Sequence, residues 1–233
     1  MSEQPSPSNS TEPPADKPAL LAAAREPALV CTRCPLAATR TNVVYGEGNP
    51  NSPLVFCGEG PGETEDATGR PFVGRAGKLL DEALRRNRMT REHVYICNVL
   101  KCRASDLQGT RRLNRPPTAE ELAACRPWLE EQLAILKPTV LICVGSPAAN
   151  SLIKKGFRMT AERGQWFTHT RHAPWVMAVL HPAYILRLEG PAYDASLDTL
   201  VADIEKARLK VIEVRRQARE AAAPPLPPRT LFE

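Results

Sequence analysis

The feature that most constrains the fold of this chain is a set of short apolar runs that do not alternate with polar residues, with Asn98 as the one polar residue among them. They span residues 54–57, 94–99, 140–144 and 176–180. Strands that are covered on both faces have this unbroken pattern. Helical patterns lie between and after the runs, over residues 77–86, 118–136, 147–154 and 197–222. This alternation predicts a three-layer α/β/α fold around a central four-stranded parallel sheet.

Local signals refine this organisation. Thr118 is a candidate N-cap, and Glu121 completes a capping box with it. In the last helix the candidates to face the core lie at helical spacing: Leu200, Val201, Ile204, Leu209 and Ile212. The flanking segments 1–27 and 223–233 are rich in proline and small residues. We therefore expect two disordered tails around a single domain of residues 28–222.

The chain has no hydrophobic targeting or membrane signal. No apolar run reaches the roughly 18–20 residues that span a bilayer. The first residues have neither the basic start nor the apolar stretch of a signal peptide. We therefore expect a cytoplasmic protein with no membrane partner. Its seven cysteines then favour metal binding, catalysis or burial over a disulfide framework.

Cysteine spacing points to a metal site. Cys31 and Cys34 form a CxxC pair outside the predicted sheet, and 22 residues separate Cys102 from Cys125. Two such pairs suit a tetrahedral zinc ion or a [4Fe–4S] cluster, and the spacing alone does not choose between them. The other cysteines lie within apolar runs and are expected to be small buried residues: Cys57, Cys97 and Cys143.

Ligands bind beyond the carboxyl ends of parallel strands, so the residues after each predicted strand matter most. The first strand leads into residues 58–77, which hold six of the thirteen glycines and four carboxylates. This stretch lacks the GxxxxGKS/T pattern of a phosphate loop. Its glycines indicate unusual backbone angles or close approach to a ligand. Its carboxylates indicate a general base, water positioning or stabilisation of a developing cation, with a solvated acidic turn as the alternative.

Three more residues at this edge are candidates for binding a flat base. Phe72 offers a ring for stacking, unless it packs under its own loop. Asn98 closes the second strand, where its amide suits either the imide edge of a pyrimidine or a cap on the strand end. His181 follows the fourth strand and precedes a proline. It is a candidate donor to a developing oxyanion, with a structural role as the alternative.

The positive charge is unevenly distributed. The chain has a net charge of +5, and residues 85–126 hold ten Lys and Arg against four Asp and Glu. Arg111, Arg112 and Arg115 cluster within this segment. A basic surface suits a phosphate polymer, although a solvated charged face gives the same composition.

Taken together, these motifs resemble the family 4 uracil-DNA glycosylases, the iron–sulfur type. The resemblance covers residues 31–189 and rests on six motifs in the family's order: CTRCPLA, GEGPGETED, GRPFVGRAG, NVLKCR, the cysteine of ELAACRPWL, and HPAYILR. It implies a DNA repair hydrolase that flips uracil out of DNA and cleaves its N-glycosidic bond. Free uracil and an abasic site are the products.

The resemblance also implies roles for individual residues. Cys31, Cys34, Cys102 and Cys125 would hold a structural [4Fe–4S] cluster. Phe72 would stack on the flipped uracil, Asn98 would read its imide edge, and His181 would stabilise negative charge at O2. The rest of the pocket would be lined by Glu59, Gly60 and Glu65.

The chain departs from its relatives at two places. A related family with the motif GQDPYH uses an aspartate to activate water, where this chain has Gly60. Glu59 or Glu65 would then position the water, or a dissociative path would need no strong base. The segment 103–117 is longer than a minimal member needs, and we expect it to be an extra DNA-contacting loop bearing Arg111, Arg112 and Arg115.

Other expectations concern DNA and partners. Ile185, Leu186 and Arg187 would supply the wedge that fills the vacated stack, or the two aliphatic residues would pack beneath His181. Some relatives with a histidine-bearing insertion bind uracil-DNA covalently, but this chain shows no clear counterpart before HPAYILR, so we expect turnover. The expected partner is uracil-containing DNA, single- or double-stranded, bound by a monomer. The sequence names no protein partner for the tails.

Two function classes compete with the glycosylase. One is an electron-transfer protein with a cluster on a flavodoxin-like sheet. The other is a non-catalytic nucleic-acid-binding protein held together by zinc. The glycosylase predicts base release, whereas neither alternative does.

Overall fold

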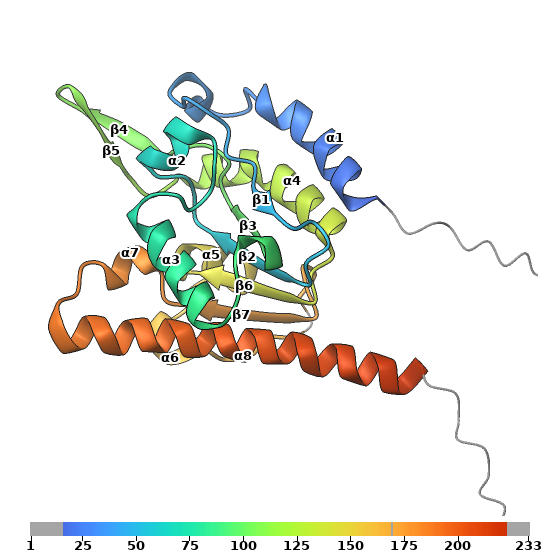
Figure 1. Cartoon of the computed structure of the whole chain (residues 1–233). Coiled ribbons are helices and arrows are strands. Elements are labelled where there is room, and N and C mark those ends of the chain that lie inside the picture. The colour runs from blue at the N-terminus through green and yellow to red at the C-terminus, as the bar shows by residue number, and fades with distance from the viewer. Residues whose placement is uncertain (1–15, 169, 223–233) are drawn as a thin grey trace, which may run out of the picture.

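A computed structural model describes residues 16–168 and 170–222 (Figure 1). At its centre lies a five-stranded sheet in the order β1-β3-β2-β6-β7. The strands are β1 (Glu47–Gly48), β2 (Leu54–Gly58), β3 (Tyr95–Asn98), β6 (Val140–Val144) and β7 (Trp175–Val179). The four strands predicted from the sequence are present and pair in parallel. The sequence did not predict β1, a two-residue antiparallel strand at the edge.

Helices cover both faces of the sheet, which confirms the three-layer α/β/α fold (Figure 1). One face packs against α1 (Lys17–Leu29), α4 (Ala119–Leu136) and α5 (Ser146–Leu152). The other packs against α3 (Arg75–Arg86), α7 (Pro182–Ile185) and α8 (Gly190–Ala222). Strand residues alternate between the two cores: Cys57 lies in the first and Phe56 in the second.

Shorter elements connect these layers. They are the helices α2 (Glu63–Thr68) and α6 (Met159–Glu162), the 3-10 turns η1 (Pro35–Ala38) and η2 (Arg91–His93), and the hairpin strands β4 (Ser105–Gln108) and β5 (Arg111–Asn114). The hairpin leaves the body of the protein as a projecting arm (Figure 1). No helix in the described part of the chain is long and apolar enough to cross a membrane.

The helix predictions were partly right. The capping box is confirmed, because the Glu121 N–H donates to Thr118 Oγ1 (3.2 Å) and the Thr118 N–H donates to Glu121 Oε2 (2.8 Å). In α8 the predicted core residues Leu200 and Ile204 are fully buried, and Val201 is partly buried.

Two predicted core positions of α8 were wrong. Leu209 is 50% exposed and Ile212 is 49% exposed. The buried face of α8 (Gly190–Ala222) runs at helical spacing through Leu200, Ile204, Ala207 and Val211, and Leu209 and Ile212 lie off this face. Their side chains therefore point away from the core that the helix covers.

The prediction of a disordered tail over residues 1–27 was wrong from Lys17 onwards, where α1 begins. Asp16 caps this helix by accepting a hydrogen bond from the Ala19 N–H (3.3 Å). Leu21 and Ala24 are buried in the core that α1 shares with α4. Apolar contacts at helical spacing thus outweighed the proline-rich composition, since proline is tolerated in a first helical turn. Residues 1–15 and the predicted tail 223–233 lie outside the described residues.

Candidate functional site

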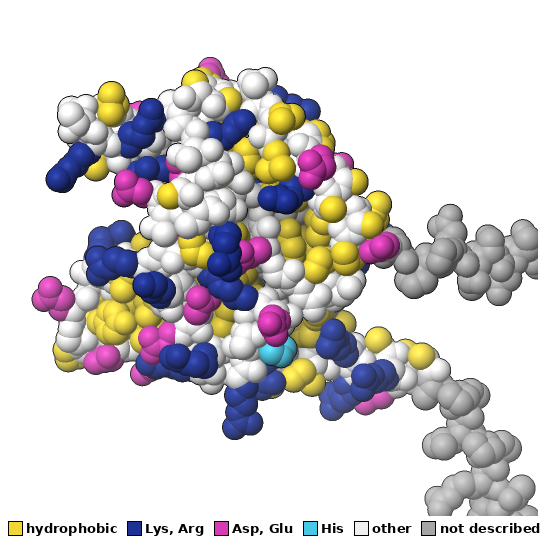
Figure 2. Space-filling view, turned by 45° about the horizontal axis from the view of Figure 1, so that its top comes forward, with side chains coloured by type: hydrophobic (Ala, Val, Ile, Leu, Met, Phe, Trp, Pro, Cys, Tyr) yellow, Lys and Arg dark blue, Asp and Glu magenta, His cyan; other side chains and the backbone are white. Residues whose placement is uncertain are grey.

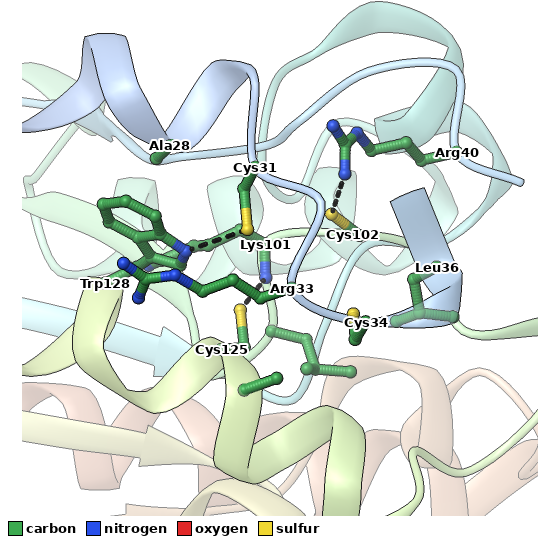
Figure 3. Close-up of a pocket in the computed structure, with 12 residues that line it drawn as sticks. Ala28, Cys31, Arg33, Cys34, Leu36, Arg40, Lys101, Cys102, Cys125 and Trp128 are labelled. Atoms are coloured by element: carbon green, nitrogen blue, oxygen red, sulfur yellow. Dashed lines mark hydrogen bonds between the residues drawn. The ribbon is translucent and has the colours of Figure 1, made fainter. Parts of the chain in front are cut away.

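The four cysteines of the predicted metal site come together although they lie on three separate segments. Cys31 and Cys34 lie between α1 and η1, Cys102 follows β3, and Cys125 is on α4. All four line one pocket, and their sulfur atoms face the same space (Figure 3). Thiolates are the ligands that iron–sulfur clusters and structural zinc sites prefer, so the chemistry of this donor set suits either group.

Hydrogen-bond donors surround three of these sulfur atoms (Figure 3). Trp128 Nε1–H donates to Cys31 Sγ (3.3 Å), the Lys101 N–H donates to Cys125 Sγ (3.2 Å), and the Arg40 guanidinium lies 3.6 Å from Cys102 Sγ. Donors of this kind stabilise negative charge on thiolate sulfur. Trp128 was not predicted from the sequence, although its position about one helical turn after Cys125 was a usable signal.

Burial keeps two of these thiols protonated in the absence of a metal. It raises the pKa of Cys102 to about 11 and also raises the pKa of Cys125. A bound metal must therefore displace these protons. Among the described residues no three or more His, Cys, Asp or Glu side chains lie close enough to hold a single metal ion.

The remaining cysteines are in the sheet, as predicted. Cys57 pairs in register with Cys97 on β3 and with Cys143 on β6. All three are fully buried among apolar neighbours. Their positions identify them as core residues and place them outside the thiol pocket.

The candidate base site lies where β2 and β3 end. Gly58 pairs in register with Asn98. A Cβ on Gly58 would lie 2.5 Å from Asn98 Oδ1 and 2.5 Å from Phe72 Cζ, so only glycine allows the amide and the ring to meet here. Asn98 is 1% exposed, and its Oδ1 is buried without a hydrogen-bond partner. A buried acceptor without a partner costs about 1–3 kcal/mol, which a ligand that donates to it would offset.

His181 lies beside Phe72, with 5.9 Å between the ring centroids. Its Nδ1 accepts a hydrogen bond from the Ala183 N–H (3.0 Å), which leaves the ring proton on Nε2. Burial, together with the nearby positive charge of Arg187, lowers the pKa of His181 to about 4, although the negative charge of Glu65 opposes the shift. At neutral pH the imidazole is therefore uncharged, with one N–H free to donate.

The four carboxylates of the glycine-rich loop have different environments. Glu65 accepts from the N–H groups of Gly62 (3.2 Å), Val73 (2.9 Å) and Gly74 (2.8 Å), which fastens the two halves of the loop together. Asp66 is buried and accepts from the Thr41 N–H (2.9 Å). These two side chains are therefore structural.

The other two carboxylates are free of such bonds. Glu63 is exposed, at the start of α2 and 3.8 Å from the Arg103 guanidinium. Glu59 is half-buried, and no described side chain or backbone N–H donates a hydrogen bond to it. Burial raises the pKa of Glu59. Among the two predicted water-positioning residues, Glu59 is thus the one with a carboxylate available for chemistry.

The glycines of this loop serve close approach more than unusual backbone angles. Of the six, only Gly69 has a positive φ (73°), at the end of α2. A Cβ on Gly77 would lie 1.7 Å from the carbonyl oxygen of Phe72. The left-handed conformation falls instead on Phe72 itself, with φ of 51°. Gly60 packs against Leu100 at the start of the loop after β3.

The predicted DNA-contacting arginines separate into two groups. Arg111 and Arg112 are exposed on the hairpin, and no ion pair forms at either within the described residues. Arg115 is not available to contact DNA, because its guanidinium bonds to Glu121 (2.6 Å) and Asp106 (2.9 Å). These bonds connect the hairpin to α4. Lys and Arg side chains gather on the projecting arm and on the surface facing it (Figure 2).

The predicted wedge segment needs a similar correction. Ile185, the last residue of α7, is fully buried in the core on this side of the sheet, so its side chain is not available to contact DNA. Leu186 is partly buried against the same core. Arg187 is exposed and lies 5.9 Å from the ring of Tyr184, which is itself 45% exposed. The surface of this segment is therefore formed by Tyr184 and Arg187.

Comparison with known proteins identifies the family. The model of the uracil DNA glycosylase superfamily matches residues 45–205. A type-4 uracil-DNA glycosylase of Thermotoga maritima is 45% identical over 182 residues, which cover 76% of this chain and 88% of the relative. One from Archaeoglobus fulgidus is 40% identical over 168 residues, covering 67% and 78%. A type-5 uracil-DNA glycosylase of Thermus thermophilus is 30% identical over 147 residues, covering 56% and 62%.

The matched region includes the loop after β2, the end of β3 and the segment around His181. These are the elements that form the base site. The chain therefore belongs to the uracil DNA glycosylase superfamily and, within it, to the type-4 uracil-DNA glycosylases.

Proposed function

We propose that this protein excises uracil from DNA by hydrolysing the N-glycosidic bond, the first step of base excision repair. One observation carries the proposal: a fully buried Asn98 amide oxygen has no partner, at the carboxyl edge where Phe72 and His181 also lie. An acceptor in this place suits the imide N–H of uracil, and the amide N–H group suits a neighbouring carbonyl. The relatives' activity and the family membership support the same reaction.

Entry of the base requires a small rearrangement. Asn98 is 1% exposed, and the Phe72 ring packs over the same point of Gly58 as the amide oxygen. A flipped uracil would displace the ring from this contact and stack on its face. Flipping costs a few kcal/mol, and base–aromatic stacking returns about 1–3 kcal/mol.

Bond cleavage leaves negative charge on the uracil. A neutral His181 with its proton on Nε2 would donate a hydrogen bond to uracil O2, where this charge develops. The bond from Ala183 N–H to Nδ1 (3.0 Å) holds the ring in that tautomer. As the C1′ atom becomes cationic, Glu59 would position the attacking water and stabilise the sugar. Glu65 would support the loop without taking part in the chemistry.

We further propose that Cys31, Cys34, Cys102 and Cys125 hold a [4Fe–4S] cluster. The all-cysteine donor set and the three N–H donors around it support this. The bound cluster would supply a cross-link between the loop after α1, the loop after β3 and α4, at a distance from the reacting bond. All seven cysteines are free in the structure, which suits the cytoplasm.

DNA would be held by the surfaces on either side of the base site. We assign the hairpin arginines Arg111 and Arg112 to phosphate contacts on one side, and Arg187 with Tyr184 to the other. Arg103 supports the arm, since it donates to Asn114 Oδ1 (2.7 Å) at the end of β5. We propose a monomer that turns over on single- or double-stranded DNA.

The main test is release of uracil from an end-labelled oligonucleotide, scored by alkaline strand cleavage. We expect cleavage at uracil and none at thymine. Replacing Asn98 by Ala removes the base-reading hydrogen bonds and should lower kcat/KM by about 10- to 100-fold, from about 1–3 kcal/mol of lost interaction. The control Asn51→Ala removes an exposed amide and should not change the rate. Intact strands from a folded wild-type protein would rule out the glycosylase.

The pH dependence separates the two glutamates. Because burial raises the pKa of Glu59, its carboxylate forms only above the usual range for glutamate. The rate should therefore rise with pH through that raised pKa, and Glu59→Gln should abolish this rise. Glu65→Gln should retain the pH profile and instead lower the midpoint of thermal unfolding, because it removes the charge and one of the two oxygens that accept the three loop N–H groups. If Glu65→Gln abolished the pH dependence and Glu59→Gln only lowered stability, Glu65 would be the residue that positions the water.

Cluster content can be read from colour. The purified protein should absorb near ~400 nm, as iron–sulfur proteins do. Cys102→Ser should remove this absorption together with protein-bound iron and sulfide. The matched control Cys143→Ser alters a buried cysteine of the sheet and should leave both in place. A colourless protein containing one zinc ion would contradict the cluster.

The role of the hairpin can be tested through salt. Each phosphate contact contributes about 0.9 to the slope of log K against log salt for duplex DNA. Replacing Arg111 and Arg112 by Ala together should reduce the slope by about two contacts on this scale. Arg115→Ala should lower stability and leave the slope nearly unchanged, because Arg115 is bonded to Glu121 and Asp106. An unchanged slope in the double variant would contradict the assignment.

A further inference from the structure

Arg91 is a mostly buried arginine that the reaction described above does not use. It begins the η2 turn just before β3, and its side chain is 19% exposed. Its guanidinium meets two acids, Glu47 on β1 (2.5 Å) and Asp81 on α3 (2.8 Å). An arginine bonded to acids on two elements would ordinarily be explained as part of the packing between them.

The same guanidinium also donates to backbone carbonyls of the base-site loop. Nη1 bonds to the carbonyl oxygen of Pro71 (2.9 Å), and Nη2 bonds to that of Phe72. The planar fork of arginine suits two neighbouring acceptors in a way that the single ammonium of lysine does not. Arg91 therefore grips the peptide groups on both sides of the Phe72 Cα atom.

This grip falls on the most unusual backbone of the base site. Phe72 has φ of 51°, a left-handed conformation that costs a non-glycine residue about 1–2 kcal/mol. Such a conformation persists only where its surroundings determine it. The next two N–H groups, of Val73 and Gly74, are held by Glu65. The Arg91 guanidinium thus binds the carbonyl groups at Phe72, and the Glu65 carboxylate binds the N–H groups that follow it.

Glu47 completes the arrangement. Burial alone would raise the pKa of Glu47, but its hydrogen bonds to Arg70 and Arg91 outweigh this and lower it. Glu47 therefore remains ionised and keeps the Arg91 guanidinium oriented. Arg70 bonds to the same carboxylate (2.8 Å), is largely exposed, and makes no contact with the Phe72 carbonyl.

We propose that Arg91 is a positioning residue for base recognition: by binding the carbonyls of Pro71 and Phe72 it holds the Phe72 backbone in the conformation from which the ring can stack on an extruded base. The inference rests on the stacking role proposed for Phe72. It assigns to an arginine outside the base site the task of maintaining a strained loop in its binding conformation.

The test is a double-mutant cycle measured as kcat and KM for excision of uracil from an oligonucleotide. The variants are Arg91→Met, Phe72→Ala and the two together. Arg91→Met should lower kcat/KM by about tenfold, within the range that loss of a base–aromatic stack gives. Once Phe72 is alanine, Arg91→Met should cause no further loss, because there is no ring left to position.

Controls separate positioning from general destabilisation. Arg70→Met removes the other arginine on Glu47 and should behave as wild type. Arg91→Lys keeps the charge without the fork, should give an intermediate loss, and replaces Arg91→Met if that variant does not fold. Thermal unfolding and absorption near ~400 nm check that each variant is folded.

Each result has a distinct meaning. Losses that multiply in the double variant would show a merely structural role for Arg91 and overturn the proposal, as would an Arg91→Met variant with wild-type kinetics. A Phe72→Ala variant with wild-type kinetics would overturn the stacking role and this inference with it. A folded wild-type protein that releases no uracil would instead overturn the proposed function.

Discussion

The pairing of β2 with β3 is the constraint on which the rest of the structure depends. Gly58 lies opposite Asn98 in the register of the two strands. The two segments stay hydrogen-bonded past the strand ends, because the Val99 N–H donates to Gly58 O (2.9 Å) and the Leu100 N–H donates to Glu59 O (2.9 Å). They then separate towards the glycine-rich loop and towards Cys102. A slip of one residue would turn the Asn98 side chain to the opposite face of the sheet.

The same pairing joins the base site to the thiol pocket. Lys101 is buried between them: its ammonium donates to the Asn98 carbonyl (2.9 Å) and to Gln132 on α4 (2.5 Å). Its backbone N–H donates to Cys125 Sγ (3.2 Å). The strand end that carries the Asn98 amide is thus bonded to residues that border the cysteines.

Much of this architecture could be predicted from the sequence, because apolar runs and motif order are local signals. The four parallel strands, the capping box at Thr118 and the gathering of the four cysteines follow from such signals. The errors arose where tertiary contacts decide whether a side chain is buried, paired or exposed. Arg115 has the same chemistry as Arg111 in the sequence, but only the fold brings it to Glu121. Burial of Ile185 likewise depends on what packs around it, whereas Leu209 was assigned to the wrong helical face, since it lies about two and a half turns after Leu200.

The carboxylates of the loop illustrate the same limit. The sequence shows four acids near a glycine-rich turn and gives no means of ranking them. Backbone N–H groups from other parts of the chain donate hydrogen bonds to Glu65 and Asp66. Glu59 is the half-buried carboxylate that accepts no such bond within the described residues. The positive φ of Phe72 was equally hidden, since phenylalanine rarely adopts it and no local pattern predicts it.

The central claim is that the unpartnered amide of Asn98 reads the imide edge of uracil. Nuclear magnetic resonance of the isotope-labelled protein titrated with free uracil tests it most directly. The account predicts that uracil shifts the side-chain amide of Asn98 and the ring signals of Phe72, and that 3-methyluracil, whose imide N–H is blocked, does not. Equal shifts with both compounds, or shifts confined to residues away from Asn98, would contradict it.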